Sequence, residues 1–226
     1  MKTETVLEWI GREMVIAIIR GVGPGQILDT ARAIKAGGIS NMEITFDHGT
    51  PEGIGDTLES IRRVKAGLGD QVNVGAGTVL TAEEAELAAE AGAEYMISPG
   101  MDPAVIRRTK ELGKISIPGA LTPTEVCKAW DCGADFVKMF PAGVLGLEYL
   151  KAVRGPLRHI PMCAVGGISP ENIGLFLDAG IRCFGIGGNL VSVEAVRRGD
   201  FHKLTQAAIG YRQAVCRWQE NGRGER

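Results

Sequence analysis

One lysine stands inside an apolar stretch, where a charged side chain is out of place. Residues 135–141 have the pattern of a short buried strand, in which Phe136, Lys138 and Phe140 share one face. Burial among apolar neighbours favours the neutral form of an amine, and a neutral lysine amine attacks carbonyl carbons to form a Schiff base. The alternative is structural: Lys138 lies at a strand end and extends its ammonium group to water.

A carboxylate and an arginine lie at the ends of two other expected strands. Alternation in residues 41–46 places Glu43 and Thr45 opposite the apolar side chains, so both are expected to point inward. Glu43 could pair structurally with Lys138 or move protons beside it, and the two roles are compatible. Arg20 suits a planar carboxylate through paired hydrogen bonds, the alternative being an ordinary surface arginine.

Glycine-containing segments follow four of the remaining expected strands. The first two contain Thr78 and Pro99 and allow a ligand to approach the backbone closely. The last two lie where barrel enzymes bind phosphate through glycine amides and a helix N-terminus. Together these two predict a phosphorylated substrate, the alternative being a pair of tight turns. Their candidate phosphate ligands are Gly166, Gly167, Gly187, Gly188 and Asn189.

These residues need a scaffold, and the chain alternates short apolar runs with longer amphipathic stretches. The runs recur at intervals of roughly twenty to thirty residues, which is typical of repeated strand–helix units. Capping boxes predict two helix starts, at Thr81 with Glu84 and at Thr122 with Glu125. The apolar runs are 15–19, 42–46, 72–75, 95–98, 115–117, 136–139, 162–165 and 183–186.

The pattern predicts an α/β fold, a (β/α)8 TIM barrel that occupies residues 1–226 as a single domain. An additional N-terminal helix within residues 1–13 is expected to close the bottom of the barrel, and the polar tail 221–226 is expected to fray. An open doubly wound sheet is the competing architecture. We favour the barrel because no strand is followed by a G-x-G-x-x-G turn with a downstream acidic partner.

Composition excludes several classes of function. A net charge of −2 argues against a nucleic-acid partner, and the longest apolar run near the start is too short to span a membrane. The start of the chain has no signal-peptide pattern, so a cytoplasmic location is expected. The five cysteines and three histidines lack metal-ligand spacing, so we expect reduced thiols, no metal and no other cofactor.

Six short segments make up one recognisable pattern. They are Glu43–Thr45, Val74–Leu80, Ile97–Gly100, Ile117–Gly119, Lys138–Pro141 and Gly166–Pro170. Through them about the whole chain resembles the class I aldolases for 2-keto-3-deoxy-6-phosphogluconate (KDPG) and 4-hydroxy-2-oxoglutarate (KHG). It also resembles their relatives that act on 2-keto-3-deoxy-6-phosphogalactonate (KDPGal).

The resemblance implies a TIM-barrel carbon–carbon lyase that splits KDPG or KHG into pyruvate and an aldehyde. The aldehyde would be glyceraldehyde 3-phosphate or glyoxylate, and the former would place the enzyme in the Entner–Doudoroff pathway of carbohydrate metabolism. Lys138 would form the Schiff base with the keto acid, and Glu43 would move protons through a bound water. Family members are typically cytoplasmic homotrimers that need no metal.

The resemblance also assigns the residues that bind substrate. Arg20 would lie near the substrate carboxylate, and Thr78, Pro99 and Phe140 would line the pyruvate pocket. The glycine pairs after the last two strands, with Asn189 beside them, would form the phosphate loops.

Several positions depart from the family pattern. Asp47, followed by His48, stands where some members have arginine, and Asn189 stands where some have serine. Val165 resembles the galactonate type rather than the gluconate type, which often has threonine, so KDPGal is the alternative substrate.

Two other classes of protein remain open. A phosphate-binding barrel that is not an aldolase, such as an isomerase or a thiamine-phosphate synthase-like transferase, would use Lys138 to bind an anion. A non-catalytic sugar-acid binding protein is the third hypothesis. Glu43 together with Lys138 argues against it, because binding alone requires neither a buried nucleophile nor a base.

Overall fold

The computed structural model describes residues 3–221, and its core is a parallel sheet. All of the expected strands are present, with bounds that agree to within a few residues. The strands are β1 Val15–Ile19, β2 Asn41–Thr45, β3 Asn73–Gly77, β4 Tyr95–Ile97, β5 Ile115–Ile117, β6 Gly119–Ala120, β7 Val137–Met139, β8 Met162–Val165 and β9 Cys183–Ile186.

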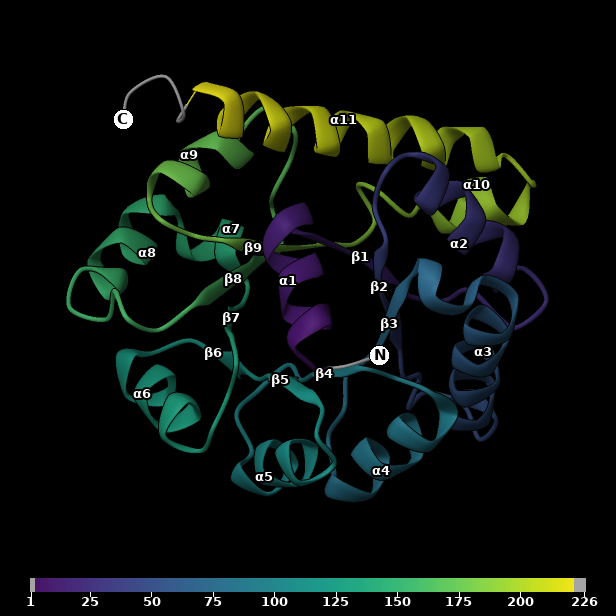
Figure 1. The fold of residues 1–226 in the computed structure, drawn as a ribbon, viewed down its shortest axis with the longest axis horizontal. Coiled ribbons are helices and arrows are strands. Elements are labelled where there is room, and N and C mark those ends of the chain that lie inside the picture. The colour runs from purple at the N-terminus through teal and green to yellow at the C-terminus, as the bar shows by residue number, and fades with distance from the viewer. Residues whose placement is uncertain (1–2, 222–226) are drawn as a thin grey trace.

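The sheet closes on itself into a barrel. The strand order is β5-β4-β3-β2-β1-β9-β8-β7-β6, and every pairing in it is parallel. β5 and β6 follow one another in the chain yet lie at the two ends of this order, which closes the ring (Figure 1). The barrel prediction is therefore confirmed, and the open doubly wound sheet is wrong.

The expected fifth strand, 115–117, is present as β5 and is followed by the short segment β6, so the described sheet has nine segments where eight were expected. Pro118 separates β5 from β6, because proline has no N–H to donate to the ladder and its ring fixes φ. β5 pairs with β4, whereas β6 pairs with β7. The proline thus separates two consecutive segments that pair with different neighbours.

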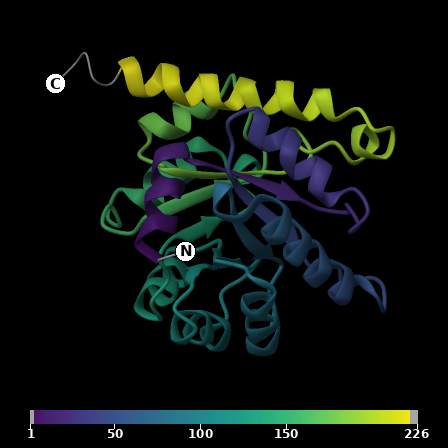
Figure 2. The same ribbon diagram turned by 45° about the vertical axis from the view of Figure 1, so that its right-hand side comes forward.

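Helices surround the barrel, and α11 runs along one side of it in contact with α2 and α9 (Figure 2). In the described part of the chain no helix combines the length and apolar character needed to cross a membrane. The helices are α1 Thr3–Glu13, α2 Ile27–Ala36, α3 Gly53–Leu68, the short 3₁₀ helix η1 Gly69–Gln71, α4 Ala82–Ala91, α5 Pro103–Glu111, α6 Pro123–Asp131, α7 Ala142–Leu145, α8 Leu147–Arg154, α9 Ile173–Asp178, α10 Val193–Arg197 and α11 Phe201–Asn221.

The additional N-terminal helix is confirmed, and α1 closes the end of the barrel where the strands begin. Its buried Val6 and Ile10 pack with the inward-facing strand residues, such as Ile16 and Phe136. At the end of α1, the Glu13 carboxylate accepts hydrogen bonds from the Ser40 amide at 2.7 Å and the Asn41 side chain at 2.9 Å. Of the tail that was expected to fray, Asn221 ends α11, and residues 222–226 lie outside the described residues.

Candidate active site

A cavity of about 560 Å³ lies at the C-terminal ends of the strands, where barrel enzymes bind their substrates. Every residue that the sequence suggested for the site lines this cavity. These residues are Arg20, Glu43, Thr78, Pro99, Lys138, Phe140, Gly166, Gly167, Gly187, Gly188 and Asn189. Sequence analysis gave no site role to Ile18, Ile168, Gly185 or Ile186, which also line it. The alternation of β1 gave a signal for Ile18, since it faces inward with Ile16.

Lys138 lies on β7 with its side chain inside the barrel mouth. The residue is only 6% exposed, so its amine does not extend into bulk water. Phe136, two residues earlier, belongs to the inner cluster, as the alternation of the strand predicted. The Lys138 Nζ atom lies 4.9 Å from the centroid of the Phe140 ring. A primary amine thus projects into a largely apolar cavity that is wide enough for a small acid.

Glu43 lies on β2 and is 1% exposed. Its Oε1 accepts a hydrogen bond of 3.3 Å from the Thr45 hydroxyl. Its Oε2 has no hydrogen-bond partner in the described structure, so this oxygen is not held by an ion pair with Lys138. Burial raises the pKa of the Glu43 carboxyl, while the charges of Lys138 and Arg20 and the Thr45 hydrogen bond act in the opposite direction. Because these effects on its pKa oppose one another, the Glu43 carboxyl can both accept and donate a proton.

Arg20 and Thr78 meet on one side of the cavity. Arg20 Nη2 donates to Thr78 Oγ1 at 3.3 Å, so the exposed arginine contacts the site rather than lying on an unrelated surface. Thr78 has a φ of +56°, which a β-branched residue adopts only at a cost of about 1–3 kcal/mol. Such strained residues cluster at ligand sites, and here the strain directs a hydroxyl toward the cavity.

Glycine loops line the other side of the cavity. Gly166 and Gly167 have φ values of +92° and +74°, which favour glycine. Gly187 and Gly188 differ, because a side chain added to either would meet no atom within 4 Å. The positive φ values therefore favour glycine at the first pair, whereas the second pair leaves open space beside the cavity.

A carbonyl behind the first glycine pair joins the two loops. Asn189 Nδ2 donates to the Ile168 carbonyl at 3.2 Å, and the Tyr211 hydroxyl from α11 donates to the same oxygen at 3.0 Å. Burial raises the pKa of Tyr211 to about 12, so the hydroxyl stays protonated and remains a donor at neutral pH. Sequence analysis missed Tyr211, because nothing in the local pattern of α11 indicates which loop it contacts.

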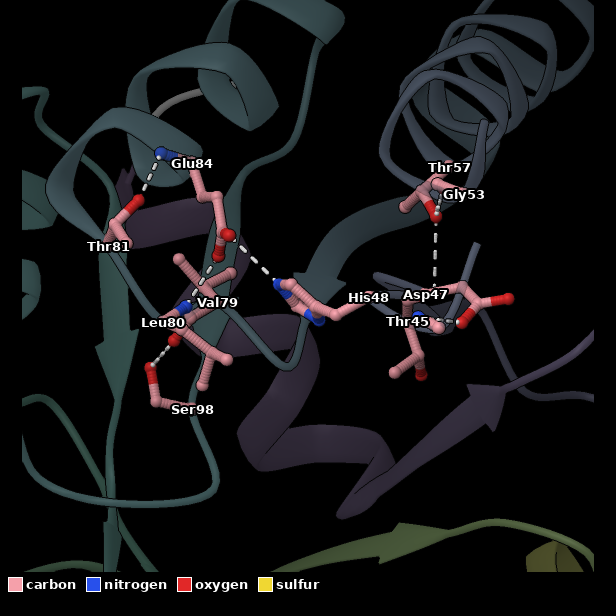
Figure 3. A network of polar contacts seen from close by, with 11 residues as sticks. Thr45, Asp47, His48, Gly53, Thr57, Val79, Leu80, Thr81, Glu84 and Ser98 are labelled. Carbon is pink, nitrogen blue, oxygen red and sulfur yellow. Dashed lines mark hydrogen bonds and ion pairs between the residues drawn. The ribbon is translucent and has the colours of Figure 1, made fainter. Parts of the chain in front are cut away.

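Asp47 and His48 lie beside the site and do not line the cavity. His48 Nε2 is 2.9 Å from Glu84 Oε1, while Glu84 Oε2 accepts from the Leu80 amide at 2.6 Å (Figure 3). The capping box expected at Thr81 is therefore only half formed: the threonine accepts from the Glu84 amide, but the glutamate carboxylate is used elsewhere.

The contact between His48 and Glu84 joins two loops of the site. His48 follows the strand that carries Glu43, and Glu84 lies in the helix that follows Thr78. The other expected capping box, at Thr122 with Glu125, is complete. Among the described residues, no group of three or more histidine, cysteine, aspartate or glutamate side chains could hold a metal ion.

Sequence comparison relates the chain to a group of aldolases. The sequence model of the KDPG and KHG aldolases matches residues 6–207. The 2-dehydro-3-deoxy-6-phosphogalactonate aldolase of Escherichia coli K12 is 31% identical over 210 residues, which cover 92% of this chain and 100% of that protein. The KHG/KDPG aldolase of the same strain is 33% identical over 187 residues, which cover 82% of this chain and 83% of that protein.

A solved structure links the same group to covalent chemistry. The KDPG aldolase of Legionella pneumophila, with pyruvate captured as a covalent carbinolamine, matches with a TM-score of 0.80 and 27% identity over 90% of this chain and 96% of that one. A carbinolamine is the adduct that loses water to form a Schiff base. The comparisons thus decide against a barrel of another enzyme class and against a non-catalytic binding protein. The chain belongs to the KDPG and KHG aldolase family of class I carbon–carbon lyases.

Proposed function

We propose that this protein cleaves a 2-keto-3-deoxy-6-phospho sugar acid to pyruvate and glyceraldehyde 3-phosphate. The observation that carries the proposal is the cavity itself, in which a buried lysine amine, a buried carboxyl and two glycine loops lie together. Lys138 is the proposed nucleophile and Glu43 the proposed acid and base. Arg20 is the proposed ligand of the substrate carboxylate.

The first stage is formation of the imine. The neutral amine of Lys138 attacks the keto carbon, and loss of water gives a protonated imine. Thr78, Pro99 and Phe140 line the cavity around this position and hold the three-carbon part of the substrate. Arg20 orients the carboxylate through paired hydrogen bonds, which sets the keto carbon within reach of the amine.

The second stage is cleavage of the bond between carbons three and four. Glu43 takes the proton from the carbon-four hydroxyl, and the electron pair of the breaking bond moves into the imine. Glyceraldehyde 3-phosphate leaves, and an enamine of pyruvate remains on Lys138. Protonation of the enamine followed by hydrolysis of the imine releases pyruvate and regenerates the amine.

Among the possible substrates we propose the galactonate epimer, KDPGal, ahead of KDPG and KHG. Val165 lines the cavity and offers an isopropyl group, which cannot hydrogen-bond a sugar hydroxyl. The match to the E. coli KDPGal aldolase spans that protein's full length, which supports the same choice. The glycine loops favour a phosphorylated acid over KHG. The test is kcat/KM for the two epimers and for KHG; higher kcat/KM with KDPG or KHG would contradict the order.

The experiment that tests the chemistry is reductive trapping. Pyruvate with borohydride should inactivate the enzyme irreversibly, because reduction converts the imine to a stable secondary amine. Peptide mass mapping should place the added group on Lys138. Lys138→Arg should lose labelling and turnover, since a guanidinium stays protonated. Lys151→Arg, at a surface lysine of α8 that pairs with Glu148, should keep both. An active Lys138→Arg enzyme, or labelling spread over many lysines, would refute the imine mechanism.

We propose that the active form is a homotrimer, as the family resemblance implies. Large apolar side chains on the surface support an oligomer, since Val144 is 84% and Leu175 is 56% exposed in the single chain. Light scattering during size-exclusion chromatography measures the mass directly. A mass near that of one chain of 24.0 kDa would contradict the trimer.

A further inference from the structure

One row of the barrel interior connects Glu43 with a tyrosine that the mechanism does not use. The strand register pairs Glu43 of β2 with Gly75 of β3. The pairing of Ala76 with Met96 places Gly75 beside Tyr95 of β4. Residues paired across parallel strands face the same side of a sheet, so the three residues form one inward-facing row with the glycine in the middle.

The missing side chain of Gly75 makes room for the tyrosine ring. A Cβ atom built on Gly75 would lie 2.1 Å from both Cδ2 and Cε2 of Tyr95 and 2.6 Å from Cζ. A Cβ atom on Gly77 would lie 1.7 Å from Glu43 Oε1. The ring and the carboxylate therefore lie over two glycines that are successive inward-facing positions of β3, and they are neighbours.

Two buried polar atoms in this row have no hydrogen-bond partner among the described residues. They are Glu43 Oε2 and Tyr95 Oη. The carboxylate oxygen is an acceptor, and the hydroxyl can donate. A single water suits this pair, because it can donate to the carboxylate and accept from the hydroxyl.

We propose that Tyr95 is a positioning residue for Glu43, acting through one buried water that its hydroxyl holds against Glu43 Oε2. This inference rests on the proposed role of Glu43 as the acid and base. The water donates to the carboxylate, so it stabilises the ionised form that takes the proton from the substrate hydroxyl. The tyrosine does not touch the substrate, since it does not line the cavity.

Other titratable groups near Glu43 and Tyr95 also affect the protonation of these two residues. Burial and the charge of Glu43 raise the pKa of Tyr95, so the hydroxyl stays protonated and can donate to the water. Lys138 and Arg20 face Glu43 and favour its ionised form. The remaining titratable groups near the tyrosine are Glu13 of α1, Cys163 of β8 and Cys183 of β9.

Tyr95→Phe tests the proposal, because it deletes the hydroxyl and keeps the ring over Gly75. The water then loses one of its two partners and holds the carboxylate less well. The acid limb of the pH profile of kcat/KM should move to higher pH by about one unit, as expected for loss of a hydrogen bond to a charged group. Tyr149→Phe is the matched control, since its hydroxyl donates to the Leu121 carbonyl away from Glu43, and its profile should coincide with that of the parent.

A second measurement does not depend on turnover. In protein with ¹³C-labelled glutamate, the Glu43 carboxyl resonance is the one that Glu43→Gln removes, and its titration should shift with the acid limb in Tyr95→Phe. A high-resolution crystal structure of the parent should show one water bonded to Glu43 and Tyr95. An unmoved acid limb and an unmoved titration, or a crystal structure without that water, would overturn the inference. Full activity of Glu43→Gln would instead refute the proposed base.

Discussion

Two glycines of the proposed phosphate subsite should respond in opposite ways to the same added methyl group. A Cβ atom on Gly188 meets nothing within 4 Å, and the residue does not have a left-handed φ. A Cβ atom on Gly167 would lie 2.7 Å from the Gly143 Cα, and Gly167 has a φ of +74°. We therefore expect Gly188→Ala to act on substrate binding and Gly167→Ala to act on stability.

The magnitudes follow from these surroundings. The Gly188→Ala methyl group projects into the space where the substrate phosphate would lie, so it should remove one hydrogen bond to a charged group, worth about 1.5–3 kcal/mol. That corresponds to a loss of roughly 10- to 150-fold in kcat/KM. Its Tm should stay the same or rise slightly, because an alanine restricts the unfolded chain. Gly167→Ala should lose about 1–3 kcal/mol through backbone strain alone, which lowers the Tm by several degrees in a chain of this size.

The assay compares kcat/KM for a phosphorylated acid with that for the unphosphorylated acid of the same configuration. Gly188→Ala should lower only the first value, since only the phosphorylated acid would place a phosphate beside Gly188. Calorimetry supplies the Tm of each variant. Equal losses on both acids, or no loss on either, would refute the placement of the phosphate beside Gly188, and an unchanged Tm of Gly167→Ala would refute the strain argument.

Four further predictions concern the remaining groups of the site and its chemistry. Glu43→Gln should reduce turnover roughly a hundred- to ten-thousand-fold while reductive trapping with pyruvate still works; near-normal turnover would mean that the carboxyl is only structural. The same variant should have a higher Tm than the parent at neutral pH, because burial raises the pKa of Glu43 and its ionisation costs stability above that pKa. This difference in Tm should shrink as the pH falls toward the ordinary glutamate pKa. Thermal scans of both proteins at several pH values check this. Arg20→Lys should raise KM for 2-keto acid substrates roughly tenfold or more with little effect on stability, since an ammonium cannot form the paired hydrogen bonds of a guanidinium to a carboxylate. An unchanged KM would argue against a carboxylate contact. Exhaustive EDTA treatment should leave turnover unchanged, and a loss restored by added magnesium or zinc would contradict the Schiff-base mechanism.

Local patterns determined the strands and the direction of their side chains. Alternation placed Lys138 inward with Phe136, and the inner cluster of the barrel contains Phe136. The same argument placed Glu43 inward, and it lines the cavity. A strand has a period of two residues whatever its partners are, so this information is present in the sequence itself. The positions of the site residues just after successive strands could be predicted for the same reason.

The extra segment β6 and the completion of the capping boxes depended on distant partners. Pro118 was visible in the sequence, but only barrel closure decides that β5 pairs with β4 and β6 with β7. The Thr81 and Thr122 sequences have the same capping pattern. At the first, one oxygen of the Glu84 carboxylate contacts His48 from another loop and the other accepts from the Leu80 amide. A local motif cannot exclude a competing partner that is far away along the chain.

Register is the other property that only the tertiary structure decided. Nothing near Tyr95 in the sequence indicates that its ring lies over Gly75, next to Glu43, because that contact depends on how three strands align. Likewise, the hydrogen bond of Tyr211 to the Ile168 carbonyl joins residues 43 positions apart. The sequence by itself determined which side chains face the barrel interior, since this follows from backbone geometry within one strand. The tertiary structure decided which of them meet, because strand alignment and barrel closure are set by the packing of the whole chain.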